Sequence, residues 1–187
     1  MTQATFFSEW LPLDKKEFRV LAMLADKGKF QGNLSDMCRY FSLNPQNRAR
    51  SQLRESIQRL ADQGFIEYEV SGRNYTLRAI PKVEKIEMPR KWLTLLRQHH
   101  YSSESVSWEV IVKVWLWLSA CGGDQVIKND MIADDLKISV STVIAAKNVL
   151  QNEFAAITKK YISEKHGEDF FVRLGQKINV AAWWAAD

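Results

Sequence analysis

The 187-residue chain contains little cysteine, histidine, proline or glycine, and it has no long hydrophobic run. Its two cysteines, Cys38 and Cys121, lie inside apolar helical patterns, so we interpret them as core residues in a reducing compartment. The most apolar segment, 110–121, is too short to cross a bilayer and contains Lys113. The first residues show no cationic stretch followed by an apolar core, which argues against a secretory signal. We therefore expect a cytoplasmic protein without a membrane partner.

Sequence motifs of common enzyme classes are also missing. The chain has no glycine-rich phosphate loop, no G-x-S-x-G motif and no H-E-x-x-H motif. The adjacent His99 and His100 would point in different directions on a helix, and no Cys, Asp or Glu stands at ligand spacing from them. The pair Asp134-Asp135 is interpreted as exposed to solvent. The sequence therefore gives no reason to expect an enzyme, a metal site or any other cofactor.

Positive charge is concentrated in the first half of the chain. The formal net charge at pH 7 is +4, and residues 1–90 account for all of it, with 15 Lys and Arg against 11 Asp and Glu. Residues 91–187 contain 11 residues of each sign and are therefore neutral. A polyanion is expected to bind the first half.

The segment 80–91 separates two halves with the same predicted order of elements. It contains two prolines and alternating charges, which interrupt both apolar periodicities in the way typical of a linker. The first half is predicted to contain helices at 13–29, 34–41 and 46–63, followed by strands at 65–70 and 75–80. The second half is predicted to contain helices within 108–123, 126–138 and 139–154, then strands at 156–163 and 170–175 around a turn at 164–169.

Three helices followed by a β-hairpin make a winged helix, which is a relative of the helix-turn-helix. We therefore predict an α+β fold, mostly α, built from two winged-helix domains. The domains are expected at residues 1–80 and 108–187, and the linker 81–107 is expected to hold a short helix.

Residues 132–150, IADDLKISVSTVIAAKNVL, resemble the helix-turn-helix of bacterial winged-helix transcription regulators. The resemblance is carried by a small residue and a leucine, followed by Ser-x-x-Thr-Val, at Ala133, Leu136, Ile138, Ser139, Thr142 and Val143. Residues 34–70 are similar as well, and they include the ending L-x-x-x-G-F-I that leads from a helix into a wing. Two such domains in one chain also resemble the initiators of plasmid and mobile-element replication. The resemblance implies sequence-specific binding of double-stranded DNA.

The segment 42–54, SLNPQNRARSQLR, carries three arginines and no acidic residue at the start of a predicted helix. Cations at a helix N-terminus oppose the helix dipole, so a role other than helix stability is expected to retain them. If the first half is a winged helix, this is its recognition helix, and its N-terminal residues would enter the major groove. The alternative is a solvated helix face.

The expected DNA contacts of the first half fall into two groups. Base edges are assigned to the guanidinium and amide side chains at the helix start, namely Gln46, Asn47, Arg48 and Arg50, because guanidinium groups suit guanine and amides suit adenine. Phosphates are assigned to Ser51 and Arg54, and Arg73 at the hairpin tip is expected to enter the minor groove or to hold a phosphate.

The second predicted recognition helix departs from the family pattern. Apolar residues stand where polar ones are common, at Val140, Ile144, Ala145 and Ala146. The residues that could reach a groove are Ser141, Thr142, Lys147 and Asn148. Packing against a protein through this face is therefore an alternative to DNA contact.

The helix within 108–123 is apolar on all sides, so it must be covered by the rest of the chain or by a second copy, as in a homodimer. Three functions stay open at this level. They are a transcription regulator, a replication initiator of a plasmid or mobile element, and a winged-helix protein-interaction module that does not bind DNA.

Overall fold

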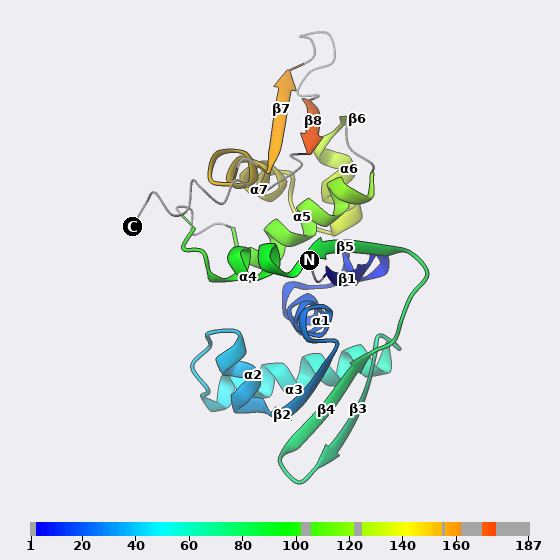
Figure 1. Ribbon diagram of the computed structural model, residues 1–187, viewed down its shortest axis with the longest axis vertical. Coiled ribbons are helices and arrows are strands. Elements are labelled where there is room, and N and C mark those ends of the chain that lie inside the picture. Colours follow the sequence, from blue (N-terminus) through cyan, green and yellow to red (C-terminus); the bar gives the residue numbers. More distant parts are fainter. Residues whose placement is uncertain (1–2, 102–105, 122–124, 155, 162–169, 175–187) are drawn as a thin grey trace. The chain divides into compact units, whose positions relative to one another are not determined.

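The computed structural model describes residues 3–101, 106–121, 125–154, 156–161 and 170–174 (Figure 1). The chain divides into two compact units, Met1–Leu93 and Thr94–Asp187. In the described ranges the fold is α+β and mostly helical, with seven α-helices and three small antiparallel sheets. Within these ranges, none of the helices has the length and apolar character needed to span a membrane.

The first unit begins with β1 (Gln3–Phe7) and the short 3-10 helix η1 (Ser8–Trp10). The elements that follow are α1 (Lys15–Lys27), β2 (Lys29–Asn33), α2 (Leu34–Tyr40), α3 (Asn47–Asp62), β3 (Ile66–Ser71), β4 (Asn74–Ala79) and β5 (Lys85–Pro89). Strand β1 pairs with β5, and the second sheet has the order β2-β4-β3. Helix α4 (Arg90–Gln98) spans the boundary between the two units.

Local capping signals explain where α1 and α2 begin. Asp14 accepts hydrogen bonds from the backbone N–H groups of Lys16 and Glu17 at the start of α1. Asn33 and Asp36 form a capping box at the start of α2. At the N-cap of α3, the Gln46 side chain makes no capping hydrogen bond.

The core of the first unit lies between α1, α3 and the two sheets. Helix α1 packs against α3, and their facing side chains are buried: Phe18, Leu21 and Leu24 on α1, and Leu53, Ile57 and Leu60 on α3. This stripe has helical periodicity, so burying it fixes which face of α3 is left on the surface.

The β3–β4 hairpin ends in a two-residue turn, because Ser71 pairs with Asn74. Gly72 takes the first central position with a φ of 61°. This geometry favours glycine and places Arg73 at the tip.

Replacing Gly72 with alanine is expected to lower the free energy of unfolding by about 1–2 kcal/mol, because an L-residue is strained at positive φ. A Cβ at this position would meet no atom within 4 Å, so the loss would come from backbone strain alone. Urea unfolding measures it, and Ser71→Ala in the same turn is the control. An unchanged unfolding midpoint for Gly72→Ala would rule out this strain.

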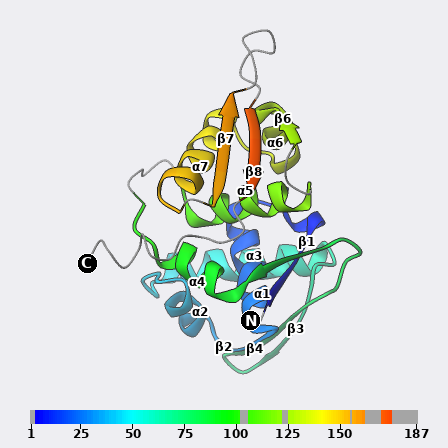
Figure 2. The same ribbon diagram turned by 45° about the horizontal axis from the view of Figure 1, so that its top comes forward.

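The second unit contains α5 (Trp108–Ala120), β6 (Gln125–Ile127), α6 (Asn129–Leu136), α7 (Val140–Asn152), β7 (Ile157–Tyr161) and β8 (Phe170–Leu174). Its sheet has the order β6-β8-β7, and β7 and β8 run side by side next to α7 (Figure 2). Ser139 caps α7 as its side chain accepts from the Thr142 backbone N–H. The predicted turn at 164–169 lies outside the described residues.

Helix α5 is buried along its length, with every side chain from Ile111 to Leu118 in the interior. Helices α6 and α7 pack against it. Trp117 Nε1 donates to Asp135 Oδ2 of α6 at 2.8 Å, so Asp135 is a structural hydrogen-bond acceptor as well as a surface carboxylate. Helices α6 and α7 therefore cover part of this apolar helix within the second unit.

Candidate nucleic-acid interface

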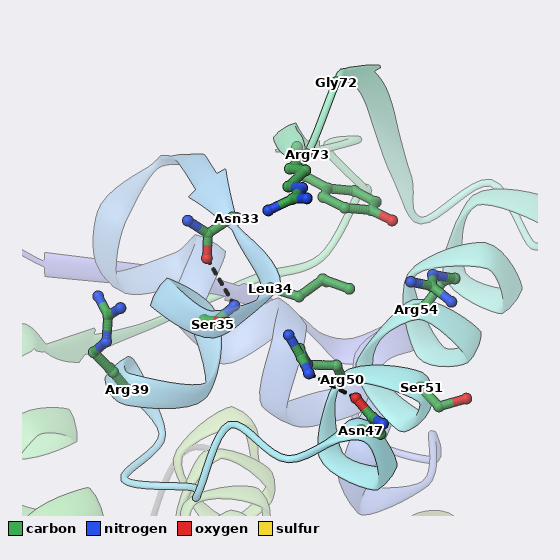
Figure 3. A pocket seen from close by; sticks show the side chains of 11 residues that line it. Asn33, Leu34, Ser35, Arg39, Asn47, Arg50, Ser51, Arg54, Gly72 and Arg73 are labelled. Atoms are coloured by element: carbon green, nitrogen blue, oxygen red, sulfur yellow. Dashed lines mark hydrogen bonds between the residues drawn. The ribbon is translucent and has the colours of Figure 1, made fainter.

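An open groove of about 810 Å³ lies on the first unit between α2, the first half of α3 and the tip of the β3–β4 hairpin (Figure 3). Its lining is predominantly polar and cationic: Asn33, Leu34, Ser35, Arg39, Asn47, Arg50, Ser51, Arg54, Gly72, Arg73 and Tyr75. Three segments that are separate in the sequence therefore form one concave surface.

Helix α3 contributes four residues to the groove with the spacing i, i+3, i+4 and i+7, namely Asn47, Arg50, Ser51 and Arg54. Residues at this spacing share one face of a helix. The face differs from the buried stripe of α3, so the packing of the core turns these side chains outward.

The arginines of the first unit differ in whether an acid neutralises them. Arg39 pairs with Asp36 at 2.7 Å, and Arg59 pairs with Glu17 at 3.0 Å. In the described part of the chain, Arg50, Arg54 and Arg73 are in no such ion pair. Of the four arginines that line the groove, only Arg39 is therefore paired with a carboxylate within the described residues, and the other three give the groove a positive potential.

Two hydrogen bonds orient exposed side chains in the first half of α3. Arg50 Nη2 donates to Asn47 Oδ1 at 2.6 Å, and Ser51 Oγ donates to Glu55 Oε1 at 3.1 Å. Both bonds connect exposed positions on the same helix, one at i, i+3 and the other at i, i+4. These bonds orient the amide of Asn47 and the hydroxyl of Ser51, two groups that the sequence predicts to contact DNA.

Seven residues of the first half were predicted to contact DNA, and the structure divides them. Five line the groove: Asn47, Arg50, Ser51, Arg54 and Arg73. Gln46 and Arg48 are exposed on or before α3 but lie outside this lining. The arginines of the segment 42–54 therefore do not all face the same way.

Sequence reasoning did not assign Asn33, Ser35 and Tyr75 to the site. Asn33 and Ser35 belong to the capped start of α2, which only the tertiary fold brings to the groove. Tyr75 could have been found, because it follows the predicted hairpin turn and stands two residues after Arg73. Its ring stacks on Tyr68 with centroids 6.4 Å apart, which fixes it beside the hairpin tip.

Cys38 of α2 is fully buried near the groove. Burial raises the pKa of its thiol, and the Arg50 guanidinium and a backbone hydrogen bond oppose this rise only in part. The thiol is therefore protonated at neutral pH and unsuited to act as a nucleophile. In the described residues no group of three His, Cys, Asp or Glu side chains is placed to hold a metal ion, and His99 instead contacts Glu153 at 2.6 Å.

The predicted residues of the second half lie on α7. Ser141 is exposed, and Thr142 is half-buried. Ser139 Oγ lies 2.8 Å from Ser141 Oγ and 2.7 Å from Thr142 Oγ1, so the three hydroxyls form one small cluster at the helix start.

The assignment of Lys147 to DNA contact is wrong. Its side chain is only 1% exposed, and its Nζ donates to Asn129 Oδ1 at 2.8 Å. The physical reason is its position four residues after the core residue Val143, on the inward face of α7. The four-residue spacing from Val143 can be read from the sequence, and it could have excluded Lys147 as a DNA contact.

Comparison of the chain with protein-family models gives no match, and a search of curated proteins gives none either.

Proposed function

We propose that the chain binds double-stranded DNA through its first unit, as a winged-helix protein without catalytic activity. In this proposal α3 is the recognition helix and enters the major groove, and the β3–β4 hairpin is the wing. The observation that carries it is the face formed by Asn47, Arg50, Ser51 and Arg54 opposite Arg73. A helix lying in the major groove reads bases with this spacing.

The charges of the groove support the same proposal. Guanidinium groups bind phosphates and guanine edges bidentately, and Arg50, Arg54 and Arg73 are in no ion pair within the described residues. Ser35 and Asn33, at the capped start of α2, add polar groups of the kind that contact the DNA backbone.

We also propose that the second unit binds a protein rather than DNA. Because Lys147 is buried, it offers no positive charge to a phosphate. The exposed residues at the start of α7 carry hydroxyls, apart from the apolar Val140, which is 38% exposed. Met131 on α6 is 53% exposed. Exposed apolar side chains such as these two suit contact with a protein better than contact with a phosphate backbone.

Sequence-specific binding is expected to serve transcription regulation. A regulator of this kind would act as a homodimer on a palindromic site, which places one α3 in each half-site. Replication initiation at repeated sites in a plasmid or mobile element is the alternative. Site selection from random sequence separates the two by the symmetry of the enriched sites.

The proposal is tested by fluorescence anisotropy of a labelled mixed-sequence duplex, titrated with the protein over a salt series. If three arginines neutralise phosphates, the logarithm of the binding constant should fall with the logarithm of the salt concentration with a slope of about −2.7 or steeper. Absence of binding at low salt, where the attraction is strongest, would contradict the proposal.

Replacing Glu55 with glutamine is expected to tighten binding to mixed-sequence DNA about two- to fivefold. Glu55 is an exposed carboxylate on α3, bonded to Ser51 next to the proposed DNA-binding face, and its charge repels phosphates. Anisotropy at low salt measures the change. Glu87→Gln, at an exposed position of β5 that does not line the groove, is the matched control and should have a smaller effect. Equal effects of the two changes would show that only the net charge matters.

A further inference from the structure

The hydrogen bond between Arg50 and Asn47 determines what each side chain can do in the groove. Both residues line it, and they lie at i and i+3 on α3 (Figure 3). The Oδ1 atom of Asn47 accepts from Arg50 Nη2 at 2.6 Å. A bond to a charged donor at this distance is a strong one.

This bond conflicts with the adenine contact that the sequence predicted for Asn47. An asparagine that reads adenine uses both ends of its amide, since Oδ1 accepts from the adenine N6 amine and Nδ2 donates to N7. In this structure Oδ1 already accepts from Arg50. Reading adenine would therefore require the Arg50 bond to break or to be shared.

Arg50, in contrast, keeps most of its hydrogen-bonding capacity. A guanidinium has five N–H donors, and the Asn47 bond uses one of them. The remaining donors can form the bidentate contact with guanine O6 and N7. A guanidinium that is already oriented loses less rotamer freedom when it binds than one that is not.

We propose that Asn47 is a positioning residue that orients Arg50, and that Arg50 reads a guanine. Asn47 itself specifies no base. This inference rests on the proposed DNA binding of the first unit. The two arginines of the α3 face then differ: Asn47 orients Arg50 but makes no hydrogen bond to Arg54.

The test is a double-mutant cycle on base preference. Wild-type protein first enriches its sites from a pool of random-sequence duplexes. Anisotropy then gives the affinity of wild type, Asn47→Ala, Arg50→Ala and the double variant for one enriched duplex and for each of its single-base-pair changes. Arg50→Ala should reduce discrimination at one G·C pair by roughly 5- to 150-fold. Asn47→Ala should reduce discrimination at that same pair, and the double variant should lose no more than Arg50→Ala alone.

Asn47→Asp separates positioning from base reading. Aspartate keeps an acceptor for Arg50 and suits the first turn of a helix, but it cannot donate to adenine N7. This variant should keep the preference at the G·C pair while its affinity for all duplexes falls by a similar factor. Circular dichroism and urea unfolding confirm that each variant is folded.

Three results would overturn the inference. They are a loss of preference at a different base pair in Asn47→Ala, additive losses in the double variant, or an Asn47→Asp protein that behaves like Asn47→Ala. If wild-type protein enriches no site and binds no duplex at low salt, the proposed DNA binding itself is contradicted. That outcome does not depend on the variants, so it is distinguishable from the three results above.

Discussion

Replacing Arg50 and Arg54 together with alanine is expected to weaken binding to a selected duplex by about 2–6 kcal/mol, a factor of roughly 30 or more. Both guanidinium groups line the groove, and within the described ranges no carboxylate pairs with either. Each arginine lost from a base edge or a phosphate removes a charge-assisted hydrogen bond, which is stronger than a neutral one. The salt dependence should also become shallower by up to about two in the slope, because fewer counterions are released.

The matched control for this experiment is Arg78→Ala/Lys85→Ala. These two exposed cations belong to the same unit, on β4 and β5, but do not line the groove. The control removes the same formal charge, so it should cause only the small loss expected from long-range attraction. If both double variants lost affinity equally, net charge and not the groove would be responsible.

Replacing Asn129 with leucine is expected to lower the free energy of unfolding by about 2–4 kcal/mol. Asn129 Oδ1 accepts from the buried Nζ of Lys147, and a buried ammonium that loses an acceptor is strongly destabilising. Urea unfolding followed by tryptophan fluorescence measures the loss, since Trp115 and Trp117 lie in the same unit.

A second variant makes the origin of this loss testable. Asn129→Leu/Lys147→Met replaces the buried polar pair by apolar side chains of similar size, which is often neutral or stabilising. It should recover most of the lost stability, and an additive loss would contradict this explanation. Because Lys147 is not at the surface, Lys147→Met should leave DNA affinity and its salt slope unchanged.

The helices were predictable because their signals are local. The apolar stripe of α3 and the N-cap residues Asp14 and Ser139 occur within a few residues of the elements that they specify. Helix α3 runs from Asn47 to Asp62, within a residue of the predicted bounds. The β3–β4 hairpin was also predictable, since its turn and alternating pattern are close together in the sequence.

Strands β1, β2 and β5 could not be predicted because their partners are distant in the sequence. Gln3 pairs with Pro89, and Lys29 pairs with Arg78. The segment KFQGN of β2 contains a single large apolar residue, so only its pairing with β4 makes it a strand. Segment 85–89 was assigned to a linker for the same reason.

The candidate site was predictable in composition but not in geometry. The sequence identified Arg50, Arg54 and Arg73 from a helix start and a turn. It could not show that Arg48 lies outside the groove lining or that Asn33 belongs to it. These facts depend on the rotation of α3 against α1 and on the approach of α2 to the hairpin, which are properties of the folded core.

The most direct test of DNA binding by the first unit is the mapping of backbone amide chemical shifts by NMR while a short mixed-sequence duplex is added at low salt. If the first unit binds DNA, the perturbed amides should cluster at residues 47–54 and 72–75, with smaller changes at the start of α2 near Asn33 and Ser35. Perturbations confined to residues 139–145 of the second unit, or no perturbation anywhere, would contradict DNA binding by the first unit.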